Sequence, residues 1–237
     1  YGKATYGTGS SVMVNIGEQA VAAPEGLVTS VAFSALGRNF YAFEGNIHCT
    51  GVTITWLKDQ LGMIQSPAEI EAIATSVEDN GGVYLVPAFS GLGAPWWNDK
   101  VKAIICGLSL GSTKAHICRA TLESIAYQVA DLINSMTKSA GIRLKEVRVD
   151  GGPTKNKFLM QFQADMLQAP IVRSEVEDAS AFGALVMNGF ALGKWSSFEE
   201  AEAVWSASEP VRPVHTESEM AELYDGWHKA IGMLIQK

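Results

Sequence analysis

The chain has 237 residues, of which 47% are hydrophobic and 18% are charged, a balance that is ordinary for a folded globular protein and excludes a disordered one. Its formal charge of −7 argues against broad electrostatic binding to nucleic acid or acidic lipid. The longest uncharged window, residues 81–98, holds four glycines and two prolines, so the sequence predicts no membrane-spanning helix there. No basic segment followed by an apolar stretch opens the chain, so no secretory signal is expected.

The cysteines are Cys49, Cys106 and Cys118, an odd number with no CxxC pair. A disulfide framework or a zinc site is therefore not expected, and a reducing cytoplasm is the expected setting. The four histidines are scattered and form no HExxH pair. We therefore predict no metal ligands from these residue types.

Short β-prone runs separated by glycine-bearing turns make up the first third of the chain. Strands are expected at residues 3–6, 11–15, 28–33 and 40–43. Helical patterns follow at residues 46–60 and 67–75. Two further strands are expected at residues 83–89 and 103–108, on either side of a segment rich in glycine and proline.

Strands and helices alternate strictly in the second half. A long helix is expected at residues 113–139, with Ser112 as its N-cap, because apolar residues recur there at three- and four-residue spacing. The remaining strands are expected at residues 147–149 and 171–173, and the remaining helices at residues 155–167, 179–192, 198–204 and 217–235. A strand meander followed by strand–helix units predicts an α/β fold in which helices cover both faces of a mixed sheet.

The first candidate site is the turn of residues 6–11, YGTGSS. Glycines at Gly7 and Gly9 allow positive φ and a close approach of a ligand to the backbone amides, and Thr8 adds a hydroxyl. The turn could cradle a phosphate. The alternative, which the turn by itself favours, is a tight hairpin in which these residues serve the geometry alone.

The second candidate site follows the strand of residues 147–149, where the chain reads DGGPTKN. Ligands of open α/β sheets bind beyond the carboxyl ends of strands, and a following helix N-terminus favours an anion. Gly151 and Gly152 would let a base or phosphate lie against the backbone, with Asn156 placed to hydrogen-bond it. The alternative is a tight strand–helix connection capped by Asp150.

A third glycine, Gly51, falls in the early turn of an expected helix, where glycine is costly unless something packs closely against it. That close neighbour could be a ligand or the sheet itself. Neither GxGxxG nor GxxxxGK[ST] occurs in the sequence, so a dinucleotide fold of the dehydrogenase kind and a P-loop are not supported.

Several longer stretches resemble one known family. AIICGL at residues 103–108 and HICRATLE at residues 116–123 match a family signature, and YGTG, VPAFSGLGAPWW and RVDGG look familial as well. These stretches resemble the C-terminal domain of the FGGY carbohydrate kinases, in their glycerol kinase-like branch. The resemblance covers essentially the whole chain.

The resemblance implies a ribonuclease H-like domain of the actin-like ATPase superfamily, in which two such domains close on ATP, Mg²⁺ and substrate. Residues 1–237 would then be the C-terminal nucleotide-binding domain, without the N-terminal sugar-binding domain. By resemblance, the outer phosphates would lie at Gly7, Thr8 and Gly9, and Gly51 would lie near the phosphates or ribose. The adenosine would be held by Gly151, Gly152 and Asn156.

The sequence departs from the glycerol kinase pattern at several positions. Thr55 is also expected to line the nucleotide site by resemblance, but it stands where glycerol kinases usually carry a glutamine on the adenine side, so the nature of that contact is open. Ser11 stands where they carry an aromatic residue near the polyol. These departures leave the acceptor open: the resemblance implies glycerol or a related sugar or polyol, with a ketopentose such as xylulose as the alternative.

The family's general base is an aspartate expected upstream of Tyr1, so no catalytic residue is expected in this chain. Because a base and the positioning of the acceptor supply much of the rate, the chain alone is predicted to be inactive as a kinase. Its expected partners are the sugar or polyol, the N-terminal domain and further copies in a homo-oligomer, with neither nucleic acid nor membrane. The rival hypothesis is a non-enzymatic, actin-like nucleotide-binding module.

Overall fold

The computed structural model describes residues 1–176 and 178–235. Within these residues the main sheet has six strands in the order β3-β4-β2-β1-β7-β8. The meander from β1 to β4 is antiparallel, whereas β7 pairs in parallel with both β1 and β8. The strands are β1 (Gly2–Tyr6), β2 (Ser10–Gly17), β3 (Val28–Ala35), β4 (Arg38–Ile47), β7 (Val147–Asp150) and β8 (Ile171–Arg173). The expectation of a mixed sheet is confirmed.

The helices lie mostly where the apolar periodicity places them. They are α1 (Gly51–Asp59), α2 (Glu69–Ala74), α3 (Lys114–Ala140), η1 (Gly152–Lys155, a 3₁₀ turn), α4 (Lys157–Leu167), α5 (Ala179–Ala191), α6 (Phe198–Glu202) and α7 (Glu217–Ile235). Two short strands, β5 (Tyr84–Val86) and β6 (Ile104–Cys106), pair with each other outside the main sheet. Among the described residues, none of the helices combines the length and the apolar character needed to cross a bilayer.

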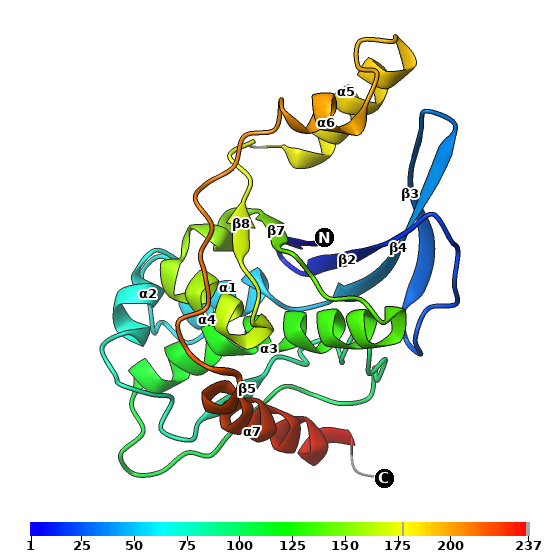
Figure 1. Cartoon of the computed structure of the whole chain (residues 1–237). Helices are drawn as coiled ribbons and strands as arrows, with labels where there is room; N and C mark the ends of the chain where they lie inside the picture. The colour runs from blue at the N-terminus through cyan, green and yellow to red at the C-terminus, as the bar shows by residue number, and fades with distance from the viewer. Residues whose placement is uncertain (177, 236–237) are drawn as a thin grey trace.

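The core lies between the main sheet and the long helix α3, which runs along one face of it (Figure 1). Alternate residues of β1 and β2 point to this face, and Ala4, Val12 and Val14 are fully buried. The phenol of Tyr6 donates a hydrogen bond of 2.8 Å to Oε1 of Gln163 on α4. This packing fixes the ends of β1 and β2, and with them the position of the turn that joins these strands.

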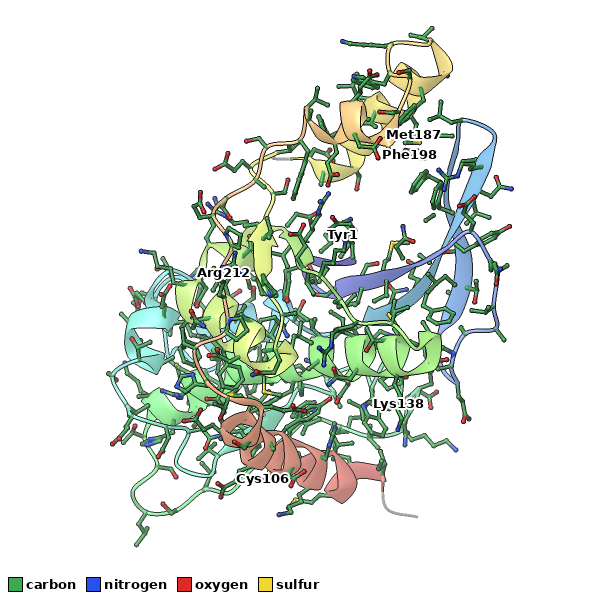
Figure 2. All side chains as sticks on the ribbon, in the orientation of Figure 1. Tyr1, Cys106, Lys138, Met187, Phe198 and Arg212 are labelled. Atoms are coloured by element: carbon green, nitrogen blue, oxygen red, sulfur yellow. The ribbon has the colours of Figure 1, made fainter. Side chains whose placement is uncertain are left out.

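On the opposite side of the sheet, α5 and α6 extend away from the body of the molecule toward the tip of the β3–β4 hairpin (Figure 1). Phe198 on α6 packs its ring edge-on against Phe33 and Phe40 of the β3–β4 hairpin, and Figure 2 shows Phe198 beside that hairpin. The expectation that helices cover both faces is confirmed. A cavity of about 340 Å³ on this side of the sheet is lined mainly by residues of the strands, together with Ala179 and Trp205.

One expected helix boundary is wrong. A helix was expected from residue 46, but β4 continues through Ile47 and the helix begins only at Gly51. Asn46 and Ile47 stay extended because they pair with Ser11 and Ser10 of β2. This pairing joins segments far apart in the sequence, so local helical periodicity does not reveal it.

The expected N-cap of the long helix is also wrong by one residue. Thr113, not Ser112, caps α3: its side chain accepts from the Ala115 amide and shares a capping box with His116. The Ser112 hydroxyl instead accepts from the Ser109 amide at 2.9 Å and closes the preceding turn. The helix expected from residue 155 likewise divides into η1 and α4, separated by Asn156.

The last helix, α7, is fastened to α3 by one buried carboxylate. Asp131 accepts hydrogen bonds from the Tyr224 hydroxyl at 2.6 Å, the Trp227 indole at 2.8 Å and the His228 ring at 2.9 Å. The Trp227 side chain is fully buried, and its ring stacks on Tyr127 of α3. All three donors come from α7. We call Asp131 together with these three side chains the Asp131 cluster.

The Asp131 cluster makes stability depend on pH. The hydrogen bond to Asp131 raises the pKa of His228 above its ordinary value of 6.5. The stabilisation that the charged His228 imidazole gives to the folded state is therefore fully present below pH 6.5. It is lost as the pH rises through the raised pKa. We expect the free energy of unfolding to fall as the pH rises from below 6.5 through the raised pKa of His228, by about 1 kcal/mol or less because the imidazole is partly exposed.

Urea denaturation across this pH range measures the effect. A His228→Gln variant, which keeps a donor but does not titrate, should lose the slope, whereas His48→Gln at an exposed position should retain it. A slope that survives in His228→Gln would assign the pH dependence to other groups.

Candidate functional site

A groove of about 770 Å³ opens beyond the carboxyl ends of β1 and β7. Its volume falls in the range of small-molecule sites. The sheet places it here because the parallel strands β1 and β7 end at the same edge, with Thr5 opposite Asp150. The groove is lined by Tyr6, Gly7, Thr8, Gly51, Val52, Ile54, Thr55, Pro67, Ala68, Ile70, Glu71, Gly152, Pro153, Lys155 and Asn156.

One wall is the turn between β1 and β2, docked on the start of α1. The Gly51 amide donates to the Gly7 carbonyl at 3.0 Å, and the Val52 amide donates to the Thr8 carbonyl at 3.1 Å. The hydroxyl of Thr50, a buried residue, donates to the Gly7 carbonyl at 3.1 Å. The turn carbonyls thus satisfy amides that a helix start leaves unpaired, and Gly7 and Thr8 stay exposed at the groove.

Two glycines make this docking possible. A Cβ on Gly51 would lie 2.5 Å from the Gly7 carbonyl oxygen, and a Cβ on Gly9 would overlap the carbonyl oxygen of Ile47. Gly51 therefore sits at the first position of α1 because the turn packs against it, and its amide is already engaged. What Gly51 offers a ligand is a wall without a side chain.

The second wall is the turn after β7. Gly151 has φ 99° and ψ 168°, a backbone conformation that side chains disfavour, and a Cβ there would overlap the carbonyl oxygen of Tyr6. Gly152 has no atom within 4 Å of a Cβ position and lines the groove. The first glycine thus lets the chain turn beside β1, and the second leaves a flat, open shelf.

Asn156 joins this shelf to α4. Its Oδ1 accepts from the Leu159 amide at 2.8 Å as the N-cap, which leaves the Nδ2 group as the donor for a ligand. The alternative in which Asp150 caps the connection is wrong. The Asp150 carboxylate instead lies 3.7 Å from Nζ of Lys3, its neighbour on the sheet.

Six of the eight residues expected from the sequence line the groove, namely Gly7, Thr8, Gly51, Thr55, Gly152 and Asn156. Gly9 and Gly151 lie behind the walls, where they allow the close packing just described. The exposed Thr55 returns its hydroxyl to the Gly51 carbonyl at 3.3 Å. The two glycine turns, distant in the sequence, therefore face one groove.

Sequence reasoning missed the third wall, which is the start of α2. Pro67, Ala68 and Ile70 are unremarkable residues for a ligand site, and only Glu71 carries a ligand-like group. The segment was expected to be helical, but nothing in its pattern placed it opposite a glycine turn. Its position depends on packing against α3, where Ile70 and Ala74 are buried.

Charge in the groove is balanced rather than strongly positive. Lys155 and Glu71 both line it, so the backbone rather than a cluster of cations faces an incoming anion. Burial raises the pKa of Tyr6 well above its ordinary range, so this phenol stays neutral. No three His, Cys, Asp or Glu side chains gather as metal ligands within residues 1–176 and 178–235.

The strand order, the helices on both sides and the two turns at one sheet edge agree with the actin-like ATPase fold that the sequence resemblance implied. The chain belongs to the FGGY family of carbohydrate kinases: the family's C-terminal domain model matches residues 2–192. The resemblance inferred from the sequence motifs, including its glycerol kinase-like character, is confirmed by the relatives that follow.

Glycerol kinase 1 from Clostridium tetani and glycerol kinase from Petrotoga mobilis are each 46% identical to this chain over 229 residues. The match covers 97% of this chain and 46% of each relative. This chain therefore spans about half the length of the curated relatives it matches.

Solved structures agree on the fold. The glycerol kinase of Plasmodium falciparum, a structure described as containing ADP, is 32% identical with a TM-score of 0.93, over 100% of this chain and 47% of that one. A ligand-bound xylulose kinase from Lactobacillus acidophilus is 18% identical with a TM-score of 0.86, over 98% of this chain and 46% of that one. The latter likeness concerns the fold alone.

Proposed function

We propose that this chain is the ATP-binding part of a polyol kinase of the glycerol kinase type, with residues 1–237 forming its C-terminal nucleotide-binding domain. The observation that carries the proposal is the single groove into which both glycine turns open. The complete enzyme would transfer the γ-phosphoryl group of MgATP to a hydroxyl of glycerol or a related sugar or polyol.

The geometry supports a phosphate end and an adenosine end. The exposed turn of Gly7 and Thr8 offers backbone and hydroxyl groups at one side of the groove, which suits phosphate oxygens. The open backbone of Gly152 beside Asn156 suits a flat base or ribose on the other side. Gly9, Gly51 and Gly151 support this site by allowing the walls to approach, and Thr55 completes the wall on α1.

In this proposal the magnesium ion would bind together with the nucleotide, as MgATP. With no cluster of acidic or imidazole ligands among the described residues, the ion would be held mainly by phosphate oxygens, as hard cations prefer. Bound there, it would neutralise charge that develops on the transferred group. The residues of this chain position the nucleotide, while the acceptor and its general base belong to the rest of the enzyme.

Glycerol or a similar polyol is favoured as the acceptor over a ketopentose. The two glycerol kinases named above are 46% identical to this chain and the glycerol kinase structure is 32% identical, whereas the similar xylulose kinase structures share 17–24%. An aspartate base upstream and closure of two domains would be needed for turnover, so we propose that this chain alone binds nucleotide without acting as a kinase. A cytoplasmic homo-oligomer remains part of the same proposal.

A calorimetric titration of this chain with MgADP tests the proposal. We expect saturable binding with one site per chain, and a Gly152→Trp variant should raise the Kd at least about a hundredfold. The indole would occupy the open shelf and remove contacts that we place at about 3 kcal/mol. Thermal denaturation of both proteins checks that the variant stays folded.

Gly183→Trp is the matched control. Gly183 is exposed on α5 and also has open space around a Cβ, so the same substitution there should leave the Kd unchanged. If Gly152→Trp binds MgADP with the Kd of the wild type, the nucleotide binds elsewhere. Absence of binding in the folded wild-type chain would contradict the proposal that this domain holds the nucleotide by itself.

A further inference from the structure

The third wall of the groove is joined to the second by a single side chain. Glu71 projects from α2, and its Oε2 accepts a hydrogen bond of 3.1 Å from the backbone amide of Lys157, the first residue of α4. Glu71 and Asn156 both line the groove. The link therefore spans from the α2 wall to the helix that carries the glycine shelf.

The start of α4 is held by two acceptors. The Lys157 amide is bound by Glu71, and the Leu159 amide by the side chain of Asn156. A carboxylate is stabilised at a helix N-terminus by the unpaired amides and the helix dipole. Asn156 is the N-cap of α4, and Glu71 binds the amide of the next residue. The position of the Asn156 side chain in the groove therefore depends on how this end of α4 is anchored.

Packing on α3 places α2 in the fold, and Glu71 adds a direct link from α2 to α4. The helix has six residues and no side-chain cap, and its buried residues, Ile70 and Ala74, pack toward the core. Beyond it, the Arg119 guanidinium donates to the Val77 carbonyl at 3.0 Å and stacks on the Phe158 ring at 4.9 Å. Arg119 thus secures the end of this segment, whereas Glu71 secures the part that faces the groove.

We propose that Glu71 is a positioning residue for the nucleotide: it sets the width of the adenosine side of the groove by tying α2 to the N-terminus of α4. The proposal rests on the proposed function of this groove. It assigns Glu71 no contact with the reacting atoms. A preformed slot lowers the ordering cost of binding, so breaking the link should weaken the nucleotide complex.

The test titrates MgADP into three variants of this chain. Glu71→Ala removes the acceptor and should raise the Kd about tenfold, the loss expected for a hydrogen bond to a charged group. Glu71→Gln keeps an acceptor oxygen for the Lys157 amide and should stay within about twofold of the wild type. Glu69→Ala, on the same helix, removes an equal charge, whose carboxylate accepts from the Gln65 amide outside the groove lining, and should bind like the wild type.

Hydrogen exchange of the Lys157 amide, followed by NMR in the nucleotide-free chain, reports on the link itself. It should quicken in Glu71→Ala and not in Glu71→Gln. All titrations are made far below the unfolding midpoint of each variant, where a loss of stability alone leaves the Kd unchanged.

Normal binding by Glu71→Ala overturns this inference, and so does equal weakening in all three variants, which would indicate a general charge effect. Failure of the wild-type chain to bind MgADP is a different outcome, because it contradicts the proposed function of the groove itself.

Discussion

Replacing Gly151 by alanine should lower the free energy of unfolding by about 4 kcal/mol. Its φ of 99° is strained for any side chain, and the added Cβ would overlap the carbonyl oxygen of Tyr6 at the end of β1. Tyr6 cannot move aside easily, because its side chain is buried and its phenol is hydrogen-bonded to Gln163. Urea denaturation of the purified variant measures the loss.

The neighbouring glycine is the control. Gly152→Ala introduces the same atom into open space, so its stability should stay within about 0.5 kcal/mol of the wild type. Comparing the two variants separates the need for glycine in the backbone at Gly151 from the ligand-facing role proposed for Gly152. A loss below about 1 kcal/mol in Gly151→Ala would mean that the two strand ends can move apart.

The second large effect is expected at the Asp131 cluster. Asp131→Ala removes the acceptor of three hydrogen bonds and leaves the indole of Trp227 buried without a partner. Loss of one side of a buried polar group costs more than its net contribution, because the remaining donors stay desolvated. We expect the free energy of unfolding to fall by about 3–4 kcal/mol, measured by urea denaturation at neutral pH.

Asp225→Ala is the control for this substitution. Asp225 is exposed on the same helix, so its removal should change stability by less than about 0.5 kcal/mol. If Asp131→Ala costs no more than this control, α7 is held by the apolar packing of residues such as Met220 and Ile231, and the carboxylate contributes little.

The long helix, the alternating strands and the two glycine turns were predictable because their evidence is local. Apolar residues at helical spacing mark α3, and a buried strand that ends in two glycines marks the turn after β7. Glycine identifies such turns even in an unknown fold, since positive φ and close backbone approach exclude most other residues. Gly151 meets both conditions.

The errors arose where distant segments decide the local structure. Asn46 and Ile47 belong to a strand only because β2 lies beside them, and a window of neighbouring residues does not contain that information. The N-cap moved from Ser112 to Thr113 because the two hydroxyls serve different turns, a matter of backbone geometry that both residue types satisfy equally.

Residue types and their spacing were therefore sufficient to establish an α/β chain with two phosphate-compatible turns and a family resemblance. Tertiary structure decided that the turns share one groove, because β1 and β7 pair in parallel from Gly2 with Val147 to Thr5 with Asp150. It also decided that the start of α2 lines the same groove and that Glu71 bonds the first amide of α4. The physical reason is the same in both cases. A hydrogen bond between two backbones, or from a helix-start amide to a carboxylate, needs no distinctive residue pattern on the partner strand or helix.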